Sequence, residues 1–155
     1  MDSLDSAAVD PLALAKLLLR CRSETPSDDG ALAVVEQALS GLGFSCTRLR
    51  FGAPPDGPVD NLFATIGDGR PHFAFAGHTD VVPAGAGWSV DPYMGVVRDG
   101  MLMGRGAADM KAAIAAMVAA AAAHIERRGV GRGASGRLSF LVTGDEEGPA
   151  VYGTD

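Results

Sequence analysis

Two short apolar runs, each followed at once by a cluster of polar residues, constrain the fold of this chain most. Residues 72–76 lead into Gly-His-Thr-Asp at 77–80, and residues 138–142 lead into Thr-Gly-Asp-Glu-Glu at 143–147. Between them lies a long alanine-rich helical segment, from about 110 to 128. Apolar strands that alternate with helices are typical of an α/β protein with a layered, parallel or mixed sheet. In such folds, polar side chains that follow the carboxyl ends of strands commonly carry the chemistry.

The remaining segments fit the same architecture. Asp10-Pro11 predicts the cap and first residue of a helix that runs to about Arg20, and a second helix is expected at about 28–39. We assign the apolar face of the first helix to three leucines: Leu14, Leu17 and Leu18. Further strands are expected at 44–51, 62–66 and 72–76, the last buried on both faces at the sheet centre because it is nearly all apolar.

The connections between these elements are also marked in the sequence. Asp99-Gly100 predicts the tight turn of a hairpin between residues 95–98 and 101–103. The glycine-rich residues 129–136 read as a flexible connector before the last strand.

Composition excludes several classes of partner. The net charge of −6 at pH 7 comes with no basic patch, so neither nucleic acid nor an anionic membrane surface is an expected partner. The longest apolar stretch, 112–123, is shorter than a membrane span, and residues 1–10 lack the basic region of a signal peptide. Cys21 and Cys46 form no Cys-x-x-Cys pair and are expected to be reduced thiols. We therefore expect a cytoplasmic protein.

The polar clusters contain the candidate site residues. His78 and Asp80 point the same way on an extended segment, so Asp80 could fix the tautomer of a metal-binding histidine, or the pair could be an ordinary capped turn. Asp109 precedes a helix and could cap it, bind metal, or do both. The three carboxylates at 145–147 could be an exposed acidic turn, or could divide the roles of metal ligand and general base.

Other motifs carry less information. His72 precedes a strand and His124 lies near the end of a helix, so both are interpreted as structural. Gly104-Arg105-Gly106 lacks the third glycine of a dinucleotide fingerprint, and no Gly-x-Ser-x-Gly elbow occurs. A serine nucleophile therefore has no support.

Four blocks, taken together, resemble the M20 family of zinc-dependent aminoacylases and peptidases. They are Gly-His-Thr-Asp-Val-Val-Pro at 77–83, Trp-Ser-Val-Asp-Pro-Tyr at 88–93, Gly-Arg-Gly-Ala-Ala-Asp-Met-Lys at 104–111 and Gly-Asp-Glu-Glu-Gly-Pro-Ala at 144–150. The last two blocks are most similar to the branch that hydrolyses N-succinyl-LL-2,6-diaminopimelate to succinate and LL-2,6-diaminopimelate, in bacterial lysine and diaminopimelate synthesis. The resemblance implies a zinc-exopeptidase-like α/β catalytic domain with amidohydrolase activity.

The resemblance also implies a role for each matching residue. His78 and Glu147 would each bind one of two zinc ions, Asp109 would bridge the two ions, and cobalt could substitute for zinc. Glu146 would be the general base that activates a water molecule, and Asp80 would orient His78. A cis peptide bond is implied after Asp109.

The chain differs from the family in length. Family members are more than twice as long; they supply two further metal ligands downstream of Glu147 and insert a separate domain that dimerises. The resemblance implies that residues 1–155 are the N-terminal part of the catalytic domain, without the dimerisation (lid) domain and the C-terminal part, and that the complete parent is a homodimer. We expect the chain alone to be poorly active or inactive. The alternatives are a sister deacylase, such as acetylornithine deacetylase, and a non-catalytic remnant.

Overall fold

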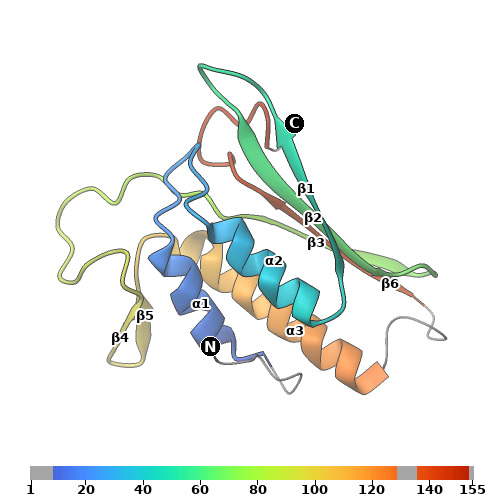
Figure 1. The fold of residues 1–155 in the computed structure, drawn as a ribbon. Coiled ribbons are helices and arrows are strands. Elements are labelled where there is room, and N and C mark those ends of the chain that lie inside the picture. The colour runs from blue at the N-terminus through green and yellow to red at the C-terminus, as the bar shows by residue number, and fades with distance from the viewer. Residues whose placement is uncertain (1–8, 129–135, 154–155) are drawn as a thin grey trace.

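A mixed sheet with helices on one face forms the centre of the molecule (Figure 1). The computed structural model describes residues 9–128 and 136–153. The sheet has the strand order β1-β2-β6-β3, in which β6 pairs parallel with β3 and antiparallel with β2, while β1 pairs antiparallel with β2. The strands are β1 (Ser45–Phe51), β2 (Val59–Gly67), β3 (His72–His78) and β6 (Arg137–Thr143). The predicted α/β class with a mixed sheet is confirmed.

Within the described residues the α-helices are α1 (Pro11–Arg20), α2 (Ala31–Gly41) and α3 (Ala112–Arg128). The α1 start was predicted correctly, because the Asp10 carboxylate accepts a hydrogen bond from the backbone N–H of Leu12 at 2.9 Å. Its apolar face was only partly predicted. Leu14 and Leu18 are buried, but Leu17 is 45% exposed, and Ala15 and Leu19 complete the buried face instead.

The core lies between these helices and the sheet. On β2 and β6, the paired residues Leu62 and Val142 point toward the helices and are buried. The neighbouring pair, Phe63 and Leu141, points to the opposite face and is 36% and 42% exposed. Side chains alternate between the two faces of a strand, so this register gives the sheet one helix-covered face and one exposed face.

The expectation that residues 72–76 lie at the sheet centre, buried on both faces, is wrong. Within the described sheet β3 is an edge strand paired with β6, and Phe73 is 57% exposed. Phe73 and Phe75 instead line a groove of about 490 Å³ between the strand and α3, together with Ala121. An apolar run does not distinguish a central strand from an edge strand beside an apolar groove, because both positions favour the same side chains.

The α3 helix and the turn before it, Ala107–Arg128, are long and apolar enough to match a membrane span by length and composition. Core helices of soluble proteins share that composition, and in α3 the residues Ile114 and Val118 are buried in the core.

The smaller predictions have mixed outcomes. The hairpin is confirmed as β4 (Val96–Arg98) and β5 (Met101–Met103), with Asp99 and Gly100 both at positive φ in the turn. Cys21 and Cys46 are free thiols, as expected. The connector predicted at 129–136 lies almost wholly outside the described residues.

Candidate metal centre

The two parallel strands β3 and β6 bring the polar clusters to one edge of the sheet. The register places His78 opposite Thr143, and the backbone N–H of Thr79 donates to the Thr143 carbonyl at 3.0 Å, one residue beyond the strand. Because the carboxyl ends of parallel strands lie side by side, the loops that follow them also lie side by side. This local pairing is why residues 67 positions apart in the sequence, Asp80 and Glu147, form a hydrogen bond.

His78 lies at the centre of the cluster, and its side chain is only 6% exposed. Its Nδ1 donates to the backbone carbonyl oxygen of Asp80 at 3.1 Å and lies 3.4 Å from the Asp80 carboxylate. Its Nε2 faces Asp109 Oδ1 at 3.1 Å and Glu146 Oε2 at 3.6 Å. A carbonyl oxygen can only accept, so Nδ1 carries a proton and Nε2 is the nitrogen turned toward the carboxylates.

The protonation of His78 reflects these neighbours. Burial lowers the pKa of His78, but its hydrogen bond to Asp80, the charge of Asp80 and the bond to Asp109 outweigh burial and raise the pKa to about 9. In the metal-free chain at neutral pH the imidazole therefore carries a proton on Nε2 as well. A cation that bound Nε2 would have to displace that proton.

Asp80 links His78 to the acidic loop. It is 1% exposed, and its two carboxylate oxygens accept the backbone N–H groups of Glu146 at 3.1 Å and Glu147 at 2.9 Å. Burial raises the pKa of Asp80, but the hydrogen bonds from His78 and from these two N–H groups lower it further, so the net shift is downward. Asp80 therefore fixes both the imidazole and the backbone that carries the two glutamates.

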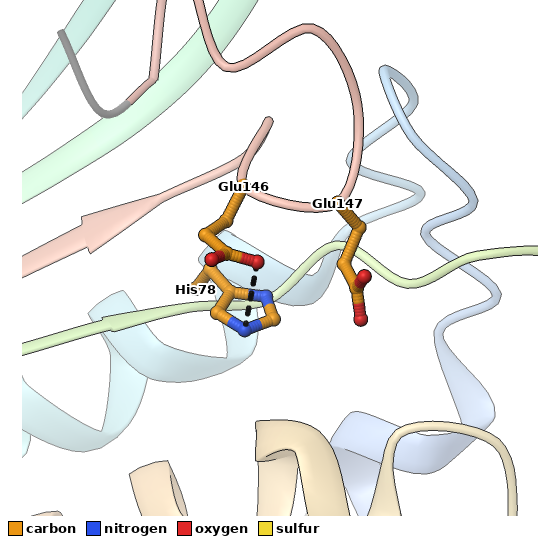
Figure 2. Close-up of side chains that lie close together, drawn as sticks. All are labelled: His78, Glu146 and Glu147. Atoms are coloured by element: carbon orange, nitrogen blue, oxygen red, sulfur yellow. Dashed lines mark ion pairs between the residues drawn. The ribbon is translucent and has the colours of Figure 1, made fainter.

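His78, Glu146 and Glu147 each offer one ligand atom, and these atoms lie within 4.8 Å of one another. Figure 2 shows both glutamates projecting from the loop after β6, with Glu146 directly over the imidazole and Glu147 beside it. Burial and the negative charge of Asp109 raise the pKa of Glu147. An imidazole nitrogen turned toward gathered carboxylates is a donor set that suits zinc and related divalent cations. The cluster is a candidate site for a divalent metal ion.

Asp109 approaches this cluster from an irregular turn, η1 (Ala107–Lys111). The peptide bond between Asp109 and Met110 is cis, as expected from the family resemblance. The alternative in which Asp109 caps the helix is wrong, because α3 begins at Ala112 and the Asp109 carboxylate, 73% exposed, contacts His78 instead. Asp109 does not belong to the three-residue ligand group, but its contact with Nε2 places it beside that group.

Two residues near the centre had not been predicted as part of it. Lys111 is fully buried, donates from Nζ to the Cys21 carbonyl at 2.6 Å, and has a pKa that burial lowers to about 8. Thr25 donates its hydroxyl to Asp145 Oδ1 at 3.0 Å. The sequence identifies Thr25 only as an extended residue before proline, so the contact could not be found from spacing. His72, interpreted as structural, is hydrogen-bonded to Ser139 at 2.8 Å.

Comparison with known proteins gives a consistent family. The model of peptidase family M20/M25/M40 matches residues 74–155. The chain is 57% identical over 149 residues to a succinyl-diaminopimelate desuccinylase of Rhodospirillum centenum, covering 95% of this chain and 38% of that protein. It is 53% identical over 147 residues to the same enzyme of Zymomonas mobilis, covering 95% of this chain and 37% of that protein. The chain thus spans little more than a third of the length of these relatives.

Solved structures show a similar fold. Human carnosine dipeptidase 1 superposes with a TM-score of 0.78 at 25% identity, over 92% of this chain and 33% of that one. The M20 family metallo-carboxypeptidase Sso-CP2 from Sulfolobus solfataricus superposes with a TM-score of 0.73 at 18% identity, over 95% of this chain and 32% of that one.

Proposed function

Because the chain belongs to peptidase family M20/M25/M40, we propose that it forms part of a zinc-dependent amidohydrolase that cleaves N-succinyl-LL-2,6-diaminopimelate to succinate and LL-2,6-diaminopimelate. The observation that carries this proposal is the group formed by His78, Glu146 and Glu147 at the shared end of β3 and β6. Residues 1–155 would be the N-terminal part of the catalytic domain, in a cytoplasmic, homodimeric parent whose further domains match the additional length of the relatives.

In this proposal His78, Asp109 and Glu147 would hold the metal, and further ligands from the parent would complete a site for two ions. Zinc is proposed as the native ion, and cobalt as a substitute, because imidazole and carboxylate donors accept both. When bound, such ions polarise an amide carbonyl and lower the pKa of water. The contact between His78 Nε2 and Asp109 Oδ1 at 3.1 Å supports the assignment, since a cation would take the place of the proton that now joins them.

Glu146 is the proposed general base. Its side chain is 48% exposed, so water can reach it, and its Oε2 lies 3.6 Å from the metal-facing nitrogen of His78. A carboxylate in this position can take a proton from the attacking water and later deliver it to the departing amine. Asp80 supports this role by holding the backbone of Glu146 and the imidazole of His78 at the same time.

Metal binding can be tested on the chain itself. Calorimetric titration with zinc should give saturable binding that is lost in His78→Ala and strongly weakened in Glu147→Gln. Glu146→Gln should retain most of the affinity, because its proposed role is proton transfer. If the wild-type chain and His78→Ala gave the same isotherm, His78 would not be a ligand.

Substrate choice is tested in a longer protein. In a chimaera, residues 1–155 replace the matching part of the Rhodospirillum centenum relative, with which they share 57% identity. The chimaera should hydrolyse N-succinyl-LL-2,6-diaminopimelate faster than N-acetylornithine, and Glu146→Gln should abolish turnover while zinc remains bound. Faster hydrolysis of N-acetylornithine would contradict the proposed substrate.

A further inference from the structure

The loop that carries the two glutamates is held at a second point, away from the metal-facing side. Asp145 precedes Glu146 and is fully buried. Its Oδ1 accepts the Thr25 hydroxyl at 3.0 Å, while its Oδ2 has no hydrogen-bond partner among the described residues. The proposed reaction makes no use of Asp145, and a buried carboxyl group with a single partner is unusual. Among the described residues, the Thr25 hydroxyl is therefore the hydrogen-bond donor that the Asp145 carboxyl group has.

Thr25 is itself fixed to the segment that carries His78 and Asp80. Its backbone N–H donates to the Val81 carbonyl at 3.1 Å, and the Val81 N–H donates to the Ser23 carbonyl at 2.9 Å. The hydroxyl of Ser23 donates to the Thr79 carbonyl at 2.8 Å in a buried position. Residues 23–25 thus lie along residues 79–81 like a short additional strand, and the side chain of Thr25 reaches from there to the acidic loop.

We propose that Thr25 is a positioning residue of the metal centre, which fixes Glu146 and Glu147 by holding the carboxyl group of Asp145. The loop then has two anchors, because Asp80 accepts the N–H groups of the two glutamates and Thr25 binds the residue before them. Through Thr25, the segment that carries the histidine and the loop that carries the carboxylates move as one body. Only the consequence for metal binding rests on the proposed function.

The packing around this hydrogen bond supports the assignment. A Cβ atom placed on Gly148 would lie 2.2 Å from Asp145 Oδ1 and 2.7 Å from Thr25 Oγ1. The loop therefore turns back directly over the bond, and a Cβ atom at residue 148 would push its two partners aside. Gly148→Ala would displace the bond without changing either partner, so it provides a second test that is independent of Thr25.

The experiment is amide hydrogen exchange by NMR on the whole chain. Thr25→Val removes the hydroxyl at nearly constant volume and should speed exchange at the amides of Glu146 and Glu147 about tenfold or more, the equivalent of one hydrogen bond to a buried group. Amides of β2 should change less than about twofold. Thr25→Ser, which restores the hydroxyl, should return both glutamates to within about threefold of wild type.

The matched control is Ser27→Ala. The Ser27 hydroxyl donates to Asp29 Oδ1 at 2.8 Å on the exposed surface, so the same chemical contact is lost away from the acidic loop, and exchange at both glutamates should not change. Unchanged exchange in Thr25→Val and Gly148→Ala, equal acceleration throughout β2, or no rescue by Thr25→Ser would each overturn the proposal. The measurement needs neither metal nor substrate, so failure of the wild-type chain to bind zinc would overturn the proposed function alone.

Discussion

Replacing Asp80 by asparagine tests the electrostatic centre of the site. The side chain keeps its size, but one of its two oxygens becomes an NH₂ group. In the native chain both oxygens accept backbone N–H groups, at 3.1 Å from Glu146 and 2.9 Å from Glu147, and the group is 1% exposed. In Asp80→Asn one buried N–H would therefore face another donor, and the protonated His78 would lose its buried negative partner, with only the more exposed Asp109 and Glu146 left beside it.

The magnitude follows from these losses. A hydrogen bond to a charged group contributes about 1.5–3 kcal/mol, and a buried donor left without a partner costs about 1–3 kcal/mol. Breaking a buried charge pair costs about 3–5 kcal/mol in total, so we expect a loss of about 3 kcal/mol in the free energy of unfolding. Urea denaturation followed by circular dichroism measures it. Asp10→Asn is the control, because asparagine caps a helix as well as aspartate and the change should stay below about 0.5 kcal/mol. A loss below about 1 kcal/mol in Asp80→Asn would refute the reasoning.

Three further predictions concern pH, metal binding and packing. With chelator present, the pKa of His78 is raised in the folded chain from 6.5 to about 9, so the folded state binds more protons at this residue. The contribution of His78 to stability is therefore greatest below pH 6.5 and falls as pH rises. Urea titrations should show a loss of up to about 2 kcal/mol by pH 8 that is missing in His78→Gln. The pKa of Lys111, lowered from 10.5 to about 8, acts in the opposite direction, so the contribution of Lys111 to stability should rise from pH 8 to 10.5 in both proteins. Zinc binding at neutral pH should release about one proton, because the metal replaces the proton on His78 Nε2. Calorimetry in two buffers of different ionisation enthalpy measures the number of protons released. A value of zero would contradict the assignment of His78 as a metal ligand. Gly144→Ala should lower the free energy of unfolding by about 3 kcal/mol in thermal unfolding, because the added Cβ would lie 2.6 Å from the Asp60 carbonyl oxygen. The control is Gly41→Ala, where the added Cβ would meet no neighbouring atom within 4 Å outside its own helix, so stability should change by less than about 1 kcal/mol.

Local signals predicted the local structure well. The Asp10-Pro11 pair predicted the first residue of α1, and Asp99-Gly100 predicted the turn of the hairpin, because caps and tight turns depend on a few adjacent residues. The same reasoning placed His78 and the acidic loop at strand ends. That these ends lie together follows from the parallel pairing of β3 with β6, a strand neighbourhood that the sequence did not predict.

Features that depend on distant pairing were not predictable in this way. The edge position of β3 depends on which strand inserts between it and β2, and hydrophobic periodicity carries no information about that order. The hydrogen bond from Thr25 to Asp145 joins residues 120 positions apart. The burial of Lys111 was hidden for a similar reason, because its acceptor, the carbonyl of Cys21, lies 90 positions away.

The position of β6 between β2 and β3 has a consequence for biosynthesis. The ribosome makes residues 137–143 after every other strand of the described sheet, yet these residues pair with both β2 and β3. Until they leave the exit tunnel, the earlier strands cannot close into the sheet, and contacts of such long sequence separation form slowly. The nascent chain therefore exposes two unpaired strand edges during translation, when early capture by a chaperone would prevent their self-association. His78 meets the Glu146 carboxylate, 3.6 Å from its Nε2, only after this last step.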